Sequence, residues 1–504
     1  MRLRTAISAA LISAALCAAA AERALTLDEA VALARARSVD AAVAANELRT
    51  AYWEYRTYRA DLLPEVSLEA TLPGYNKRYS SYQREDGSYT FLRDNNLKVN
   101  GALSVTQRIW ATGGTLSLTS SLDLVRQLDD GGSSRYMTVP VALKLSQPLF
   151  GVNDVRWKRR IEPVRYREAR AAYISATEQV AMRAVQYYFD LLSARETRAS
   201  AAQNVANAER LYATAKVRRS MGYISENDLM QIELNLLNSR SSLTESESRV
   251  RAAMFALRSF LDLDDEAEIV PALPAAPEFP EVGYDEALTR ALAGNSISMN
   301  IRRRQLEADY EVAKARGDMR QINLFVQLGY TGTDRTPGAA YGDLRSNQVV
   351  EVGVSLPLLD WGRRRGQVNV ARSRRDLTED RLRKEQADFR QDLFVLVERF
   401  NNQRGQLALA LRADEIAGRR YESSVETFLV GKISALDLND SQENKDAARA
   451  KYLDEMFWYW YYFYQLRSVT LWDFTGSRPI DDDLEPVVEQ RLRHLIAVAR
   501  RRRR

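Results

Sequence analysis

The sequence predicts an α+β fold in which one arrangement of helices and strands occurs twice along the chain. Three observations lead to this prediction. Short motifs recur at matched offsets, several segments of about ten residues alternate apolar with polar side chains, and helical segments continue for more than fifty residues without a proline. Helices in ordinary globular domains average only about 11 residues, so this chain is built differently.

Composition narrows the function before any motif is considered. The chain has 504 residues but one cysteine, Cys17, and one histidine, His494. This excludes most zinc sites, haem ligation, cysteine nucleophiles and Ser-His-Asp chemistry. We therefore expect that the protein is not an enzyme and that it binds no metal and no cofactor. The formal charge of +5 depends on seven arginines near the two ends, namely Arg2, Arg4 and Arg500 to Arg504. Without them the net charge is −2, so we expect no nucleic-acid partner.

Residues 1–21 have the layout of a secretory signal peptide. Two arginines precede an apolar run, and Ala19 to Ala21 offer a small-residue cleavage site. Cleavage there removes Cys17, which suits an exported protein without disulfides. The alternative is a lipoprotein signal in which Cys17 is acylated.

A duplication organises the rest of the chain. The segments 26–30, 146–150 and 222–225 resemble 283–287, 355–359 and 431–434, at an offset of 257 for the first pair and 209 for the others. The first copy therefore holds about 48 additional residues, between 63 and 146. We expect repeats at 22–270 and 283–475, a proline-rich linker at 271–282 and a basic tail at 476–504. Strands are expected within 63–147 and 321–357, and helix–turn–helix segments within 152–262 and 361–471.

The predicted strands have one apolar face and one polar or small face. Examples are Val66, Leu68, Ala70 and Leu72 in the first copy, and Ile322, Leu324, Val326 and Leu328 in the second. Strands of about ten residues with this alternation are typical of a transmembrane barrel, with the apolar side toward lipid. A soluble antiparallel sheet with one wet face has the same pattern, so alternation alone leaves both interpretations open.

The 48 additional residues look like a further strand pair, at 97–110 and 115–124. A tight-turn signal, Ala-Thr-Gly-Gly at 111–114, separates the two. Long polar segments at 74–96 and 126–137 are expected to be loops at the opposite end of the strands. Alternatively, the pair projects beyond the other strands or folds as a separate hairpin.

Five long helices are predicted, at 26–62, 164–220, 225–261, 363–430 and 435–471. At a rise of 1.5 Å per residue the two longest span roughly 85 and 100 Å. Apolar residues in the third helix step by three, four or seven, as in a coiled-coil seam: Leu229, Ile232, Leu236, Leu243, Val250, Met254, Leu257 and Leu261. The other faces are polar, which favours a hollow rod over a solid globule.

From about residue 25 to 475 the chain resembles the TolC family of outer-membrane efflux and secretion channels. The most specific motifs are Ser-Gln-Pro-Leu-Phe at 146–150 with Ser-Leu-Pro-Leu-Leu at 355–359, and the two turn motifs at 221–229 and 430–438. The resemblance implies a homotrimer in the outer membrane of a Gram-negative bacterium. Its β-barrel, of 12 strands or of 18 with the additional pair, is continued by a long α-helical coiled-coil barrel in the periplasm.

The same resemblance implies partners and a function. It predicts a passive exit duct that meets a periplasmic adaptor (membrane fusion) protein and, through it, an inner-membrane efflux pump or the ABC exporter of a type I secretion system. Outer-membrane lipid surrounds the barrel. Two alternatives are a coiled-coil structural scaffold, soluble or membrane-associated, and an outer-membrane barrel hydrolase, which the lack of an internal histidine disfavours.

Two acids after the second turn are the candidate gate. Asp437 and Asp440 lie at helical spacing on one face, and by resemblance they match the family's constricting acidic pair. Three copies would form two stacked rings of carboxylates, which attract cations and repel anions. The alternative is that they are ordinary acids at a helix N-terminus, where the dipole favours them.

The two turns are the candidate periplasmic tip. By resemblance Asp228 helps to latch the tip, but Phe428 and Ile433 stand where the family has the Tyr and Arg that complete this latch. Lys432, next to Ile433, is the candidate substitute. We expect the adaptor to dock beside the turns, at Gly222, Ile224, Gly431 and Ile433.

An aromatic run at 457–464 covers every face of the last helix. It fits either a membrane-interface belt or packing between neighbouring helices, and its distance along the helix from the tip favours packing.

Overall fold

The computed structural model describes residues 23–85, 87–128, 132–263, 268–319, 321–355, 359–430 and 432–480. The predicted signal peptide with Cys17, the tail from residue 481 and Gly431 lie outside these residues. The chain forms two compact units. The sheet unit comprises Thr50–Arg167 and Met299–Glu385, and the helical unit comprises Met1–Arg49, Glu168–Ser298 and Gln386–Arg504.

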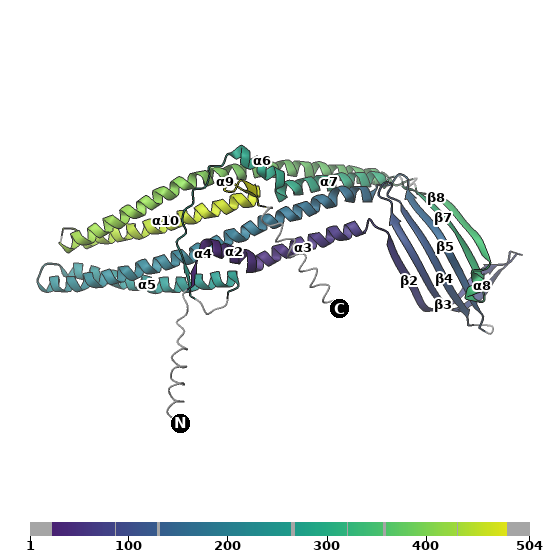
Figure 1. Ribbon diagram of the computed structural model, residues 1–504, viewed down its shortest axis with the longest axis horizontal. Coiled ribbons are helices and arrows are strands. Elements are labelled where there is room, and N and C mark those ends of the chain that lie inside the picture. Colours follow the sequence, from purple (N-terminus) through teal and green to yellow (C-terminus); the bar gives the residue numbers. More distant parts are fainter. Residues whose placement is uncertain are drawn as a thin grey trace, which may run out of the picture. The chain divides into compact units, whose positions relative to one another are not determined.

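Six antiparallel strands form one sheet in the sheet unit (Figure 1). They are β2 (Glu65–Gln83), β3 (Tyr89–Arg108), β4 (Thr115–Gln127), β5 (Ser134–Pro148), β7 (Gln321–Asp334) and β8 (Leu344–Ser355), in the order β2-β3-β4-β5-β7-β8. The predicted additional strand pair is thus β3 and β4, between β2 and β5. It is part of the sheet and not a separate hairpin.

The predicted outward loops are much shorter than expected. Residues 74–96, expected to be a polar loop, mostly continue β2 and β3, which pair from Glu65↔Thr106 to Gln83↔Tyr89. Pairing of β3 with β4 stops at Asn96↔Gln127, so the far part of the β2–β3 hairpin has no further neighbour among the strands of this sheet. Half of the segment 126–137 is likewise strand, because β4 ends at Gln127 and β5 begins at Ser134.

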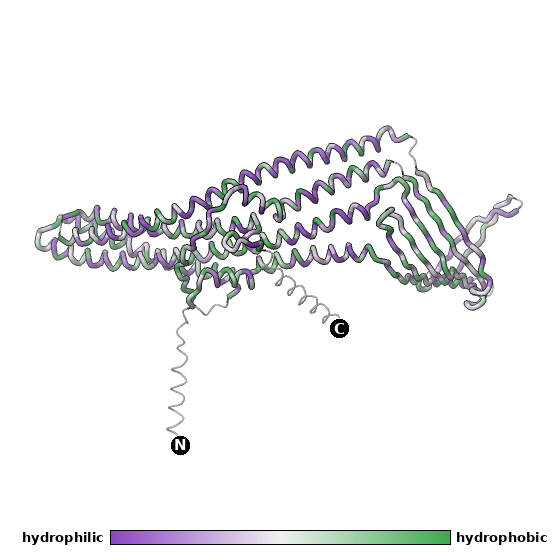
Figure 2. The backbone as a smooth tube through the Cα atoms, turned by 45° about the horizontal axis from the view of Figure 1, so that its top comes forward, coloured by the Kyte–Doolittle hydropathy of each residue, from purple (hydrophilic) through white to green (hydrophobic). Residues whose placement is uncertain are grey.

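Strand register gathers the apolar residues on one face. Leu68 pairs with Leu103, Leu143 with Leu328 and Val326 with Val350. Five of these residues remain 40–76% exposed, and Val326 is half-buried. The other face carries polar contacts between strands, such as Ser67 Oγ with Ser104 Oγ at 2.8 Å and Asn100 Nδ2 donating to Asp123 Oδ1 at 2.7 Å. Figure 2 shows the alternation along the strands.

The helices carry the rest of the chain. Two helices of 67 residues, α4 (Asp154–Ser220) and α9 (Arg363–Leu429), are each about 100 Å long. Their returning partners are α5 (Glu226–Leu261) and α10 (Ala435–Thr470). The remaining helices are α2 (Leu27–Arg37), α3 (Val39–Ala60), α6 (Tyr284–Gly294), α7 (Ser296–Gly317) and the short α8 (Pro337–Ala340). None of the helices in the described ranges is both long and apolar enough to cross a membrane.

Two predicted helix bounds were wrong. The helix expected at 26–62 is broken at Ser38, whose backbone is extended and whose hydroxyl accepts from the amide of Ala41. The helix expected to begin at residue 164 begins ten residues earlier and contains Pro163. A proline removes one backbone hydrogen bond of the helix. Near the start of so long a helix, the remaining hydrogen bonds still stabilise it.

The core of the helical unit lies where the linker crosses the helices. Short parallel strands β1 (Arg23–Leu25) and β6 (Ile269–Pro271) pair there, and Tyr188 donates its hydroxyl to the carbonyl of Leu25 at 2.9 Å. The linker residue Phe279 is buried and stacks on Phe463, with ring centroids 4.2 Å apart. Tyr459 and Tyr464 are buried as well, and no residue of 457–464 is exposed. The aromatic run therefore packs within this unit, as expected.

The first residues of the predicted tail also pack on the helical unit. β9 (Trp472–Asp473) pairs with β10 (Arg478–Pro479), and Ile480 is buried. Glu178 of the same unit is 1% exposed and accepts from Arg35 at 2.6 Å and from Arg467 at 3.0 Å.

Candidate functional site at the helical tip

The candidate site is formed by two helical hairpins of the helical unit, α4–α5 and α9–α10, which lie side by side (Figure 1). Each hairpin reverses direction within about five residues, and the two turns come from the motifs that the duplication singled out. The local sequence explains both turns.

The first turn ends α4 in a left-handed glycine. Gly222 has φ +80°, and the amide of Tyr223 donates to the carbonyl of Arg218 at 2.9 Å. The amide of Gly222 donates to Arg219 O at 3.0 Å, which completes a Schellman motif. Glycine is favoured here because a Cβ is disfavoured at positive φ.

A capping box then starts α5. The hydroxyl of Ser225 accepts from the amide of Asp228 at 3.0 Å, and Oδ2 of Asp228 accepts from the amide and the hydroxyl of Ser225 at 3.2 and 2.7 Å. The two residues thereby satisfy amides that the first turn of a helix leaves unpaired.

The second turn repeats this chemistry. The amide of Lys432 donates to the carbonyl of Thr427 at 3.1 Å, and Ser434 caps α10. Oδ2 of Asp437 accepts from the amide and the hydroxyl of Ser434 at 3.0 and 2.7 Å. Asp437 and Asp228 therefore occupy equivalent positions in the two hairpins.

Capping lowers the pKa of both acids. Hydrogen bonds from Ser225 hold the pKa of Asp228 below its ordinary value of 3.8, and those from Ser434 do the same for Asp437. Both carboxylates are exposed, so both are charged at neutral pH.

Asp440 differs from Asp437 because it has a cationic partner. Its Oδ2 lies 2.8 Å from Nη2 of Arg420 on α9, and both side chains are more than half exposed. Sequence reasoning missed Arg420. A signal existed, because Arg420 and Asp440 stand ten residues on either side of Val430, and an antiparallel hairpin brings such positions together.

A groove of about 290 Å³ separates the two hairpins. Half-buried Phe428 lines it, so this predicted latch residue faces the neighbouring hairpin. Asp228 has Ser225 as its partner, and no ion pair joins it to the exposed Lys432 in the parts of the chain that the structure describes. The predicted docking residues Ile224 and Ile433 are both half-buried beside the turns.

Polar side chains join the hairpins beside this groove. We call them the polar seam: Glu196, Ser200, Asn204, Asn207 and Asn235 on α4 and α5, with Tyr421, Asn439, Asp446 and Arg449 on α9 and α10. Asn235 donates to Asn439 at 2.7 Å, Asn204 to Asp446 at 2.7 Å, and Arg449 to Glu196 at 2.8 Å. The Oδ1 atom of Asn204 is buried without a hydrogen-bond partner. Sequence reasoning did not single out these residues.

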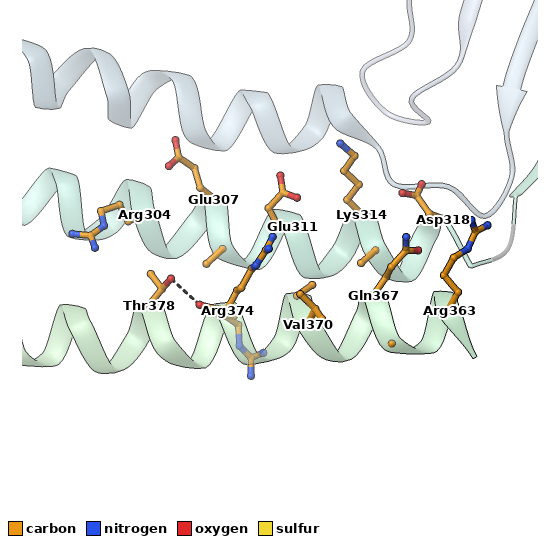
Figure 3. Close-up of a pocket in the computed structure, with 15 residues that line it drawn as sticks. Arg304, Glu307, Glu311, Lys314, Asp318, Arg363, Gln367, Val370, Arg374 and Thr378 are labelled. Atoms are coloured by element: carbon orange, nitrogen blue, oxygen red, sulfur yellow. Dashed lines mark hydrogen bonds between the residues drawn. The ribbon is translucent and has the colours of Figure 1, made fainter. Parts of the chain in front are cut away.

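The sheet unit has a groove of its own, of about 880 Å³, between α7 and α9. Figure 3 shows charged side chains of both signs along its walls, among them Arg304, Glu307, Glu311, Lys314, Asp318, Arg363 and Arg374. Such a groove is polar and open, unlike the apolar pockets that bind small molecules. Among the residues described, no group of three or more His, Cys, Asp or Glu side chains could hold a metal ion.

The sequence matches the profile of one protein family, described as outer membrane efflux protein, over residues 30–261 and 297–455. The chain belongs to the outer membrane efflux protein family. Members of this family are channel proteins of the Gram-negative outer membrane with large periplasmic parts, and they work with adaptor proteins and inner-membrane pumps. This protein is accordingly an outer-membrane efflux channel.

Solved structures share the fold of this chain. The Campylobacter jejuni CmeC outer membrane channel is 17% identical with a TM-score of 0.63, and the match covers 92% of this chain and 89% of that one. The Vibrio cholerae outer membrane protein VceC is 12% identical, with a TM-score of 0.60 and coverage of 88% and 95%. The open state of the Neisseria gonorrhoeae MtrE outer membrane channel is 15% identical, with a TM-score of 0.59 and 88% of each chain covered. No curated protein matches the sequence.

Proposed function

We propose that this efflux channel is a passive exit duct, formed by three copies, that joins a periplasmic adaptor and an inner-membrane efflux pump or ABC exporter to the cell exterior. The observation that carries the proposal is the two-faced sheet. Apolar side chains such as Leu68, Leu103 and Val350 are exposed on one face, and the other face carries polar contacts between strands. An apolar outside and a polar inside are what a water-filled barrel in lipid requires.

The strand count favours the wider barrel. Each copy contributes six strands, with β2 and β8 as the free edges of its sheet. Unpaired strand edges in lipid are costly, and closing three sheets edge to edge removes all of them. The closed trimer then has 18 strands, and its lumen is wider than that of a 12-strand barrel.

The gate of the duct is proposed at the rings of Asp437 and Asp440. Asp437 has no cationic partner among the described residues and a lowered pKa, so it supplies the negative ring. Asp440 is paired with Arg420, which offsets its charge in the protomer. While that ion pair is formed, the preference of the channel for cations is therefore due mainly to Asp437.

Opening of the gate is proposed to occur along the polar seam. Hydrogen bonds between neutral side chains contribute only about 0.5–1.5 kcal/mol each, and those to charged groups such as Asp446 and Glu196 about 1.5–3 kcal/mol, because water replaces them when they break. Separating two hairpins joined by such bonds therefore requires less free energy than separating two apolar surfaces of the same area. The α9–α10 hairpin can thus move away from α4–α5 without unfolding. Asp228, Phe428 and Lys432 remain the candidate latch, with Phe428 acting through its place in the groove.

The adaptor is proposed to dock beside Gly222, Ile224, Gly431 and Ile433. Bulky replacements, Ile224→Trp and Ile433→Trp, should abolish export but leave trimers in the outer membrane. A matched control is Leu409→Trp, at an exposed apolar residue about 20 residues before the end of α9, which should not change export. Normal export by the Ile224→Trp and Ile433→Trp proteins would place docking elsewhere.

The duct itself is tested with purified protein in planar bilayers. The proposal expects a detergent-dependent trimer that opens an ion-conducting pore. A trimer that stays soluble without detergent and does not conduct would instead support a coiled-coil scaffold.

A further inference from the structure

Exposed arginines gather where the sheet meets its helices. Six of them, here called the basic belt, stand at the end of α3 and the starts of α4 and α9: Arg56, Arg59, Arg159, Arg160, Arg363 and Arg365. All belong to the sheet unit. None of the six forms an ion pair within the described residues.

Hydrogen bonds hold the connections at this end of the sheet together. The side chain of Asn153 donates to the carbonyl of Trp110 at 3.0 Å, and Gln107 donates to Leu62 O at 3.0 Å. Arg364 donates to the carbonyl of Asp318 at 2.8 Å. The β3–β4 turn and the ends of α3, α4, α7 and α9 therefore lie at one level of the sheet unit.

Aromatic and apolar side chains are exposed at the same level. Trp110 is 58% exposed and Trp361 is 90% exposed, the latter with a left-handed backbone at φ 53°. Arg159 lies over the ring of Trp110 at 4.5 Å, and Arg56 lies over Trp53 at 5.2 Å. Leu63, Leu149, Phe150 and Leu359, in the adjoining connections, are 49–70% exposed.

Within the protomer Arg56, Arg159 and Arg160 lie over tryptophan rings, and all six arginines remain exposed. None of them forms an ion pair among the described residues, and Arg363 and Arg365 occupy the first turn of α9, where the helix dipole disfavours positive charge. A membrane–water interface typically contains tryptophan, arginine and exposed apolar side chains at one level. The rings lie among the lipid headgroups and the cations lie near the phosphates.

We propose that the basic belt binds the phosphates of anionic phospholipids in the periplasmic leaflet of the outer membrane. The partner is a lipid surface whose negative charge complements the belt and whose acyl chains meet the apolar face of the sheet. This inference rests on insertion of the sheet in the membrane but not on the gate or the docking site. Its consequence is that anionic lipid fixes the depth of the barrel and stabilises the trimer.

Titration of the detergent-solubilised trimer with lipid tests the proposal. Phosphatidylglycerol should raise the melting temperature of the trimer at roughly tenfold lower concentration than phosphatidylcholine. Raising the salt from about 0.05 to about 0.5 M should remove this preference, because the belt is exposed to solvent. Inorganic phosphate should not reproduce the shift, since it has no acyl chains.

Two variants of equal charge make the test specific. The belt variant replaces Arg159, Arg160, Arg363 and Arg365 with Gln, and should need about tenfold more phosphatidylglycerol for the same shift. The control variant replaces four exposed arginines without ion pairs elsewhere on the helices, Arg198, Arg251, Arg381 and Arg399, and should titrate like the wild type. Equal titrations of the two variants overturn the proposal, and so does a wild-type trimer that does not prefer phosphatidylglycerol. Conductance in planar bilayers is measured in parallel, so loss of the pore is distinguished from loss of lipid binding.

Discussion

Asp440 on α10 and Arg420 on α9 form an ion pair across the second hairpin, with Oδ2 and Nη2 2.8 Å apart. The pair links the gate residue to the helix that precedes the turn. It also makes the two predicted gate acids unequal, because Asp437 three residues earlier accepts only from Ser434. The predicted acidic pair is therefore one capping acid and one paired acid.

Removing Arg420 should increase the cation preference of the channel. In Arg420→Gln the carboxylate of Asp440 loses its partner, so three further negative charges line the gate of a trimer. Stability should change by no more than about 1 kcal/mol, because exposed ion pairs contribute little. Reversal potentials in a salt gradient measure the effect. Adding Asp440→Asn to this variant should restore the wild-type preference, and a channel unaffected by either change would exclude Asp440 from the pore.

The two capping acids allow charge and capping to be separated. Asp437→Asn and Asp228→Asn weaken equivalent capping boxes, but only the first removes charge from the proposed gate ring. Cation preference should fall in Asp437→Asn and stay unchanged in Asp228→Asn. A similar loss in both variants would show that the effect comes from the helix ends and not from a ring of carboxylates.

Acid should weaken the tip only at low pH. The pKa values of Asp228 and Asp437 are depressed in the folded protein, so their contribution to stability is complete above the ordinary value of 3.8. It is lost as the pH falls through the lower, folded values. Proteolysis of the tip by an acid-active protease should accelerate below about pH 4 in the wild type, and this acceleration should be smaller in the doubly substituted Asn protein. Equal acceleration in both proteins would assign the pH dependence to other groups.

Local chemistry made the tip predictable from sequence. The starts of α5 and α10 follow from Ser225 and Ser434, each with an acid three residues later. The first turn follows from Gly222. Such signals lie within a few residues of one another, so no tertiary information is needed.

Features that depend on distant residues were not predictable in the same way. Residues 74–96 read as a polar loop, and only their pairing across the hairpin, such as Asn76 with Asn96, makes them strand. Predicting the role of Arg420 requires knowledge of the hairpin geometry. Predicting the polar seam requires knowledge of how one hairpin packs on the other. The buried contact of Glu178 with Arg467 joins residues 289 apart, which no spacing rule reveals.

Gly222 should be sensitive to substitution although it has space around it. No heavy atom lies within 4 Å of a Cβ placed there, but φ is +80°. Gly222→Ala should therefore destabilise the α4–α5 hairpin by about 1 kcal/mol, measured as faster proteolysis at the turn. Gly405→Ala is the matched control, because Gly405 lies inside α9, also with open space. There alanine should be neutral or stabilising, since it favours helix. Equal effects of the two substitutions would mean that the left-handed turn does not limit tip stability.

Single cysteines along β3 should decide whether the additional strands belong to the membrane barrel. Val99 and Leu103 lie on the apolar face, where they pair with Leu124 and Leu68, and Asn100 and Ser104 lie on the polar face. In a closed 18-strand barrel, cysteine at 99 or 103 should react with a bilayer-restricted reagent, and cysteine at 100 or 104 with a charged aqueous one. Cys17 is the one native cysteine and is replaced by Ser in all variants. The same alternation at Leu324 and Asn323 on β7 calibrates the reagents, because β7 belongs to the strand set that both barrel sizes share. Aqueous labelling at every β3 position, with alternation preserved on β7, would reject the wider barrel and leave the β3–β4 pair outside the membrane.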